Sequence, residues 1–151
     1  MLKEKTLAPD FELPDESGVI RKLSDYRGKD LVLYFYPKDD TTGCTTEACS
    51  FRDDYSAYEK AGVTIIGVSK DSPNSHAKFK AKYNLPFSLL ADLDHAVCEA
   101  YGVWGRKKYM GREYDGVYRT TFLIGADGAI IQVFENVKPD GHSREILAAL
   151  P

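Results

Sequence analysis

Two cysteines, Cys44 and Cys49, stand five positions apart shortly after an apolar run in the sequence. Residues 31–36 are typical of a strand buried on both faces, and Pro37 ends that strand because proline has no N–H for the sheet ladder. The loop that follows emerges at the carboxyl edge of the sheet, where open α/β sheets place their ligand sites. In the first turn of a helix, unpaired N–H groups favour the thiolate, which is the nucleophile. The pattern therefore predicts thiol redox chemistry at Cys44.

The residues after Cys44 have a helical period, which predicts the direction of each thiol. On a helix over residues 42–60, closed by Gly62 as a left-handed cap, one core-facing stripe contains Cys44, Ala48, Phe51, Tyr55 and Tyr58. Cys49 is rotated from Cys44 by about 140°. Its face is otherwise polar, with Arg52, Asp53, Ser56 and Lys60. We therefore expect Cys44 to face inward and Cys49 to face solvent.

An inward thiolate needs a compensating positive charge. Arg119, directly before the β-rich run at residues 120–124, is the natural source. Its guanidinium stays protonated and offers several donors to a thiolate or to peroxide oxygens. Asp39 and Asp40 precede the helix as adjacent carboxylates, but adjacent side chains rarely converge on one substrate atom. We interpret them as part of a solvated loop and not as an acid–base pair.

The other candidate ligands and thiols favour simpler interpretations. Cys98 is interpreted as a small buried hydrophobic residue. Three cysteines cannot all pair within one chain, which favours one reactive pair in a reducing compartment over a secreted disulfide framework. A zinc site is disfavoured because His76, His95 and His142 lie far apart in the sequence without a close-spaced partner.

The elements that must position these residues alternate along the chain. Strands are predicted at residues 31–36, 63–69 and 88–91, with helices at 42–60, 73–83 and 95–101. They are preceded by a short hairpin around residues 14–18 and a helical turn at 23–28, and followed by strands at 117–124 and 129–135 and a helix at 141–150. This order predicts a single α/β domain over residues 1–151, with a central mixed β-sheet flanked by helices. The loop at 102–116 is expected to be the most mobile segment.

The spacing Pro37-x-x-x-Thr41-x-x-Cys44 resembles the active-site signature of the peroxiredoxins. With Cys49 as a second cysteine, the chain is similar to the bacterioferritin-comigratory (peroxiredoxin Q) branch of that family. The resemblance covers nearly the whole chain, because Ala8-Pro9-Asp10-Phe11 and Tyr118-Arg119-Thr120-Thr121-Phe122-Leu123-Ile124 also follow the family's order. It implies a thioredoxin-like fold with an N-terminal β-hairpin extension.

The resemblance also implies a role for each matching residue. The Cys44 thiolate would attack a hydroperoxide and become a sulfenic acid, which Cys49 would convert into an intramolecular disulfide. Thr41 matches the hydroxyl residue that bonds the attacked peroxide, Arg119 the activating arginine, and Glu47 a carboxylate that orients it. Pro37 acts through backbone shape and by shielding the thiol. Thioredoxin or a similar dithiol would reduce the disulfide by exchange.

One position departs from the family's pattern. Many members of this branch have proline directly before the glycine, where this chain has Thr42. The position lies outside the signature, so the chemistry is expected to survive. The loop loses a fixed φ angle, and Thr42 becomes a possible N-cap for the helix.

Composition narrows the function classes further. The formal charge of −3 is spread over interleaved acidic and basic residues, which argues against nucleic-acid and membrane partners. The N-terminus lacks an apolar signal core, so the cytoplasm is the expected compartment. We expect a monomeric or weakly associating thioredoxin-dependent peroxidase that requires no metal, haem or flavin. A general disulfide oxidoreductase is a weaker reading because Cys-x-x-Cys is absent. A non-enzymatic redox sensor that passes oxidation to a partner protein remains the alternative.

Overall fold

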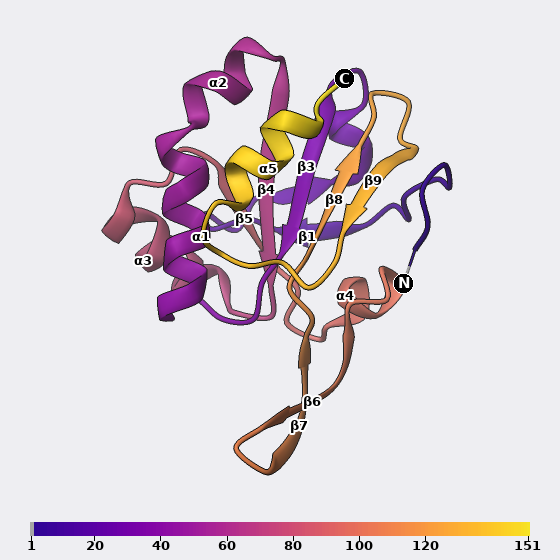
Figure 1. Ribbon diagram of the computed structural model, residues 1–151. Coiled ribbons are helices and arrows are strands. Elements are labelled where there is room, and N and C mark those ends of the chain that lie inside the picture. Colours follow the sequence, from indigo (N-terminus) through magenta and orange to yellow (C-terminus); the bar gives the residue numbers. More distant parts are fainter. Residues whose placement is uncertain (1) are drawn as a thin grey trace.

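A five-stranded mixed β-sheet forms the centre of the computed structural model, which describes residues 2–151 (Figure 1). The central strand β3 (Asp30–Phe35) pairs in parallel with β4 (Val63–Ser69) and antiparallel with β8 (Thr120–Ile124). The outer strands are β5 (Ser88–Ala91), beside β4, and β9 (Ile130–Phe134), beside β8. This architecture confirms the predicted α/β class with a central mixed sheet.

The alternating side chains of β3 divide the core into two halves. Leu31, Leu33 and Phe35 pack on one face, which α4 (Ala96–Ala100) and the N-terminal segment cover. Val32 and the residues alternating with it pack on the other face. That second face is covered by α1 (Thr42–Asp53), α2 (Tyr55–Lys60), α3 (Pro73–Tyr83) and α5 (His142–Ala149). Helices therefore flank both faces, as predicted, and Cys44 belongs to the second half of the core.

The predicted N-terminal hairpin is confirmed. It consists of β1 (Glu12–Pro14) and β2 (Ile20–Lys22), which pair antiparallel. The predicted helical turn follows at once as the 3-10 helix η1 (Leu23–Tyr26). Leu13 and Leu23 bury their side chains against the sheet.

The single helix predicted over residues 42–60 is wrong, because the chain forms two helices that meet at Asp54. The backbone of Asp54 has φ −97° and ψ 8°, outside helical geometry. Its carboxylate accepts a hydrogen bond from Ser143 Oγ on α5 at 3.0 Å. Aspartate is also among the weaker helix formers, in keeping with a break at this residue. The inward stripe nevertheless holds, except that Tyr55 is only half-buried.

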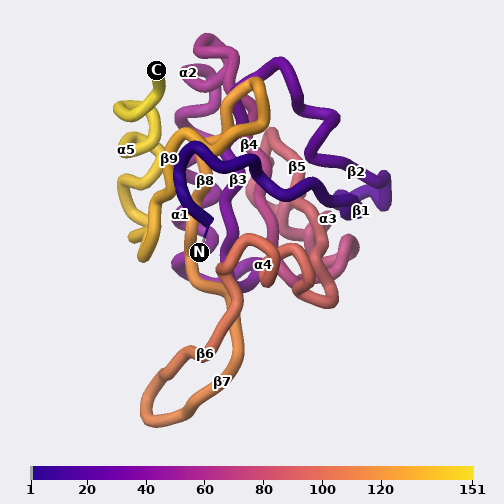
Figure 2. The backbone as a smooth tube through the Cα atoms, turned by 90° about the vertical axis from the view of Figure 1, so that its right-hand side faces the viewer, coloured from indigo at the N-terminus to yellow at the C-terminus, as the bar shows by residue number. Residues whose placement is uncertain are grey.

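The loop predicted at residues 102–116 forms regular secondary structure instead, while its mobility stays a prediction. The segment is a hairpin of β6 (Trp104–Tyr109) and β7 (Arg112–Val117), which extends away from the body in both views (Figures 1 and 2). Met110 and Gly111 form its turn with φ angles of 50° and 78°. Two consecutive positive φ angles match the strand twist of a tight hairpin. The predicted strand at 117–124 accordingly divides, since Val117 ends β7 and β8 begins at Thr120.

Not one helix within residues 2–151 combines the length and the apolar character that crossing a membrane requires.

Candidate active site

Cys44 lies at the start of α1, just beyond the carboxyl end of β3. It is the third residue of the helix and only 1% exposed. Gly43 beside it is closely packed, because an added Cβ would lie 3.3 Å from both Arg119 Nη2 and the Pro139 ring. The thiol therefore sits in a narrow site between α1, the start of β8 and the chain near Pro139.

Arg119 joins the thiol to a buried carboxylate. Its Nη2 donates to Cys44 Sγ at 3.3 Å, and its Nη1 donates to Glu47 Oε1 at 2.6 Å. Burial opposes the guanidinium charge, yet Glu47 and Cys44 raise the pKa of Arg119 above its ordinary value. The geometry thus brings together Cys44, Glu47 and Arg119, as the sequence predicted. A cation fixed by a carboxylate on one side faces sulfur on the other.

Glu47 occupies an unusual position for a carboxylate. Its side chain is fully buried, and Oε2 has no hydrogen-bond partner among residues 2–151. Burial raises the pKa of Glu47 to about 7, although Arg119 acts in the opposite direction. The cost of removing the charge from water therefore exceeds the stabilisation by the arginine.

Thr41 and Pro37 frame the loop between β3 and α1. Thr41 is exposed and occupies the N-cap position of α1, so the predicted N-cap at Thr42 is wrong. Its Oγ1 donates to the carbonyl of Lys38 at 3.0 Å and accepts no hydrogen bond from a backbone N–H of the helix. Pro37 lies two residues after the end of β3 and is half-buried. Both residues border the segment that leads to the thiol.

The other two cysteines differ from Cys44 in their surroundings. Cys49 was expected to face solvent, but it is half-buried. Burial raises the pKa of its thiol, although Arg52 acts in the opposite direction. Cys98 is completely buried, and burial, followed by the nearby Asp92, raises the pKa of its thiol. Cys98 thus matches the predicted hydrophobic role.

Sequence reasoning missed two charged residues near the site. Asp39 was expected in a solvated loop, but its carboxylate is buried, whereas Asp40 is exposed as predicted. Lys107 of the hairpin is half-buried, and its Nζ donates to the carbonyl of Val117 at 2.9 Å. The pKa of Lys107 is lowered from its ordinary value by burial and by Arg119, although Cys44 acts in the opposite direction. No feature of this lysine-rich segment indicates which residue would face the thiol.

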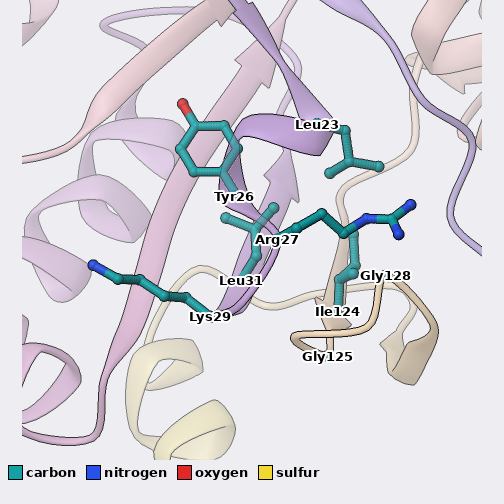
Figure 3. A pocket seen from close by; sticks show the side chains of 8 residues that line it. All are labelled: Leu23, Tyr26, Arg27, Lys29, Leu31, Ile124, Gly125 and Gly128. Carbon is teal, nitrogen blue, oxygen red and sulfur yellow. The ribbon is translucent and has the colours of Figure 1, made fainter.

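A separate small cavity lies at the opposite end of the sheet, where β3 begins and β8 ends. It has a volume of about 10 Å³, and the Arg27 side chain lies over Gly128 at its rim (Figure 3). This volume suffices for one water molecule at most. The cavity does not compete with the Cys44 site as a place for chemistry.

Comparison with known proteins extends these findings. The sequence matches the model of the AhpC/TSA family over residues 5–133. It is 54% identical over 143 residues to the putative peroxiredoxin bcp of Coxiella burnetii, with 95% of each chain covered. It is 52% identical over 143 residues to peroxiredoxin Bcp of Bacillus subtilis, with 95% of this chain and 91% of that protein covered.

A solved structure agrees over a similar length. The bacterioferritin comigratory protein of Xanthomonas campestris, described for its alkyl peroxide reduction activity, matches with a TM-score of 0.88 and 41% identity. The match covers 93% of this chain and 89% of that chain. The similarity therefore extends through the segments that hold Cys44 and Arg119.

Proposed function

Because the chain belongs to the AhpC/TSA family, in its Bcp (peroxiredoxin Q) branch, and is therefore a thiol peroxidase with a thioredoxin-like fold, we propose that Cys44 is its peroxidatic residue. The observation that carries this proposal is the contact of Arg119 with both Cys44 Sγ and Glu47 Oε1. Neither Cys49 nor Cys98 has a recorded hydrogen bond from an arginine among the described residues.

In the first step the Cys44 thiolate attacks the nearer oxygen of a hydroperoxide. The O–O bond breaks as the S–O bond forms, so that sulfur becomes a sulfenic acid and the leaving oxygen takes a proton to give water or an alcohol. The Arg119 guanidinium stabilises the thiolate and the negative charge that develops on oxygen. Thr41 supplies a hydroxyl to the bound peroxide, and Glu47 keeps the guanidinium oriented. Pro37 shields the thiol from bulk water.

In the second step Cys49 resolves the sulfenic acid. Its thiol attacks Cys44 Sγ, a Cys44–Cys49 disulfide forms, and water leaves. A thioredoxin-type dithiol then reduces the disulfide by exchange and returns both cysteines to the thiol state. The sulfurs are free in the described structure, which corresponds to the reduced enzyme.

The substrate is a hydroperoxide, and we extend the proposal to hydrogen peroxide and organic hydroperoxides. Support for the organic substrates comes from the alkyl peroxide reduction activity of the Xanthomonas campestris protein. The proposed cycle uses only cysteine redox chemistry, so it requires no metal, haem or flavin. We also propose that the protein works as a monomer, since each residue in the cycle comes from one chain.

The decisive experiment follows peroxide consumption coupled to a thioredoxin and its reductase. The wild type should turn over, whereas Cys44→Ser should not, because no alkoxide is available at neutral pH. Cys49→Ser should consume about one peroxide per chain and stop, leaving a sulfenic acid for a small thiol to reduce. A wild type that is oxidised once and then forms a mixed complex, without turnover on any dithiol, would support the redox sensor instead.

A further inference from the structure

A buried polar network lies behind the loop that leads to Cys44. Asp39 is 9% exposed and His76, in the first turn of α3, is completely buried. Their side chains meet at 2.7 Å between His76 Nδ1 and Asp39 Oδ2. Asp39 and His76 are 37 residues apart in sequence, so this contact is a tertiary one. A buried carboxylate requires compensation of its charge or of its hydrogen bonds.

The partners of each atom define the protons in this network. His76 Nε2 lies 2.9 Å from the carbonyl oxygen of Leu90, which can only accept, so Nε2 carries a proton. Asp39 accepts from Tyr36 Oη at 2.6 Å and from Ser75 Oγ at 2.8 Å. Burial raises the pKa of Tyr36, so its hydroxyl keeps the proton that it donates. One further proton lies between His76 Nδ1 and Asp39 Oδ2, and the pair is neutral overall.

The network also fixes the backbone of the loop. The N–H of Asp39 donates to Asp71 Oδ2 at 2.9 Å, and the same oxygen accepts from Ser69 Oγ at 2.6 Å. The main chain of Asp39 is therefore held by Asp71, just beyond β4, and its side chain is held by α3. The next residue, Asp40, has a φ angle of 57°, a left-handed conformation that is uncommon for a non-glycine residue, although aspartate tolerates it better than most.

This arrangement is complete without a metal ion. Asp39, Asp71 and His76 place potential ligand atoms within 4.8 Å of one another. The contacting oxygens and nitrogens already have the hydrogen-bond partners given above, and both nitrogens of His76 are engaged. The simpler conclusion is that the group holds the loop.

We propose that Asp39 and His76 are a positioning pair for the peroxide step, holding the segment from Pro37 to Thr41 so that the Thr41 hydroxyl and the Cys44 thiol stay aligned for attack. Thr41 lies two residues after Asp39, and its hydroxyl bonds to the carbonyl of Lys38, directly before Asp39. A shift of Asp39 would therefore move the Thr41 hydroxyl. The pair touches neither peroxide nor sulfur and acts through Thr41. The inference rests on the proposed roles of Thr41 and Cys44.

A neighbouring contact offers a matched control. Asp40 receives hydrogen bonds from Lys82 Nζ and Tyr83 Oη, both at 2.8 Å, and so also links the loop to α3. The Asp40–Lys82 ion pair is exposed, with side chains 44% and 56% accessible. Exposed ion pairs of this kind contribute little to stability. We therefore expect Lys82→Gln to leave the loop in place.

The test compares two reactions of Cys44 at one pH: oxidation by hydrogen peroxide, which needs Thr41, and alkylation by iodoacetamide, which does not. Asp39→Leu and His76→Gln should slow the oxidation by about 10- to 100-fold, the usual cost of a misplacement near 1 Å, and change alkylation by less than about threefold. Asp39→Asn should recover most of the oxidation rate, because its amide can donate to Nδ1 of a neutral histidine. Lys82→Gln should leave both rates unchanged.

Two results would overturn the proposal. The first is an oxidation rate within about twofold of wild type in both Asp39→Leu and His76→Gln, which is too small for a loss of alignment. The second is a parallel fall of oxidation and alkylation, which would indicate general damage to the fold. If circular dichroism shows that Asp39→Leu does not fold, the comparison rests on His76→Gln and Asp39→Asn. An inactive wild type would instead refute the proposed peroxidase cycle.

Discussion

Formation of the Cys44–Cys49 disulfide should unwind the first part of α1. Both residues lie on one continuous helix, Thr42–Asp53. Residues five apart on an intact helix have Cα atoms roughly 8.7 Å apart, from a rise of about 7.5 Å and a rotation of about 140°. A disulfide joins Cα atoms no more than about 7 Å apart, with converging Cβ directions. The bond is therefore incompatible with the reduced helix.

The extent of unwinding follows from the same geometry. Melting from Thr42 to Cys49 removes eight of the 12 residues of α1. It withdraws Cys44 from Arg119 and loosens Phe51, whose ring packs 4.8 Å from that of Tyr34. Partial loss of a buried Phe costs up to about 3 kcal/mol. The disulfide closes a loop of about six residues, which lowers the entropy of the unfolded chain and so stabilises the folded protein by roughly 2 kcal/mol. The melting temperature is accordingly a weak indicator, and a local measurement is required.

Amide hydrogen exchange with mass spectrometry provides that measurement. In the oxidised protein, amides of residues 45–52 should exchange at least about 100-fold faster, equivalent to a loss of about 2.7 kcal/mol of local stability. The α3 helix should keep its protection. Cys49→Ser, treated with one equivalent of peroxide, is the control, because it is oxidised without a disulfide. A confirmed Cys44–Cys49 disulfide with unchanged protection of α1 would refute the argument.

Three further substitutions test the surroundings of Cys44. Arg119→Ala removes the donor 3.3 Å from Sγ, so oxidation of Cys44 by hydrogen peroxide at one pH should slow, and an unchanged rate would contradict activation by arginine. Burial raises the pKa of Glu47 from 4.5 to about 7, so the folded protein retains a proton that the unfolded chain releases between these values. The free energy of unfolding should therefore fall by about 3 kcal/mol from this group as pH rises through that range. Glu47→Gln should remove this slope in urea denaturation at several pH values, and identical slopes would contradict the burial argument. Gly67→Ala places a Cβ 2.8 Å from Leu89 and 2.9 Å from Tyr34, and denaturation should show a loss of about 1–3 kcal/mol.

Features that depend on neighbouring residues could be predicted from the sequence. The helix Pro73–Tyr83 has its predicted bounds because Ser72 caps it through a hydrogen bond to the Ser75 amide and Pro73 suits its first turn. Gly62 has the predicted left-handed conformation, with φ 72°. The inward direction of Cys44 follows from the helical period alone. Each of these signals lies within about one turn of the feature it predicts.

Features that depend on distant contacts could not be predicted in this way. The burial of Asp39 results from the approach of α3, and adjacent acidic residues in a loop are ordinarily solvated. The hairpin turn uses Met110 with a positive φ angle, whereas the usual signals for such a turn are Asn-Gly and Asp-Gly. Asp54, where the helix breaks, bonds to Ser143, which lies 89 residues away, and no local signal announces that contact.

The position of Arg119 depends both on its local sequence and on a distant strand pairing. Its sequence context identifies a strand, but its distance from Cys44 is determined by the pairing of that strand with β3. Thr120 pairs with Phe35, so the residue before β8 lies beside the residues that follow β3, at the edge where α1 begins. The carbonyl of Arg119 also accepts a hydrogen bond from the Val137 amide at 3.2 Å, which holds its backbone.

The register of this pairing is therefore part of the active site. Side chains of a strand alternate between the two faces of the sheet, so a slip of one residue would turn each side chain of β8 to the opposite face. Thr121 and Leu123 would then leave the half of the core that contains Cys44, and the guanidinium would lose its path to the sulfur. Full burial of each residue in Thr120–Ile124 makes such a slip costly. Packing along β8, far from the thiol, thus maintains the contact between Arg119 and Cys44 on which the proposed chemistry depends.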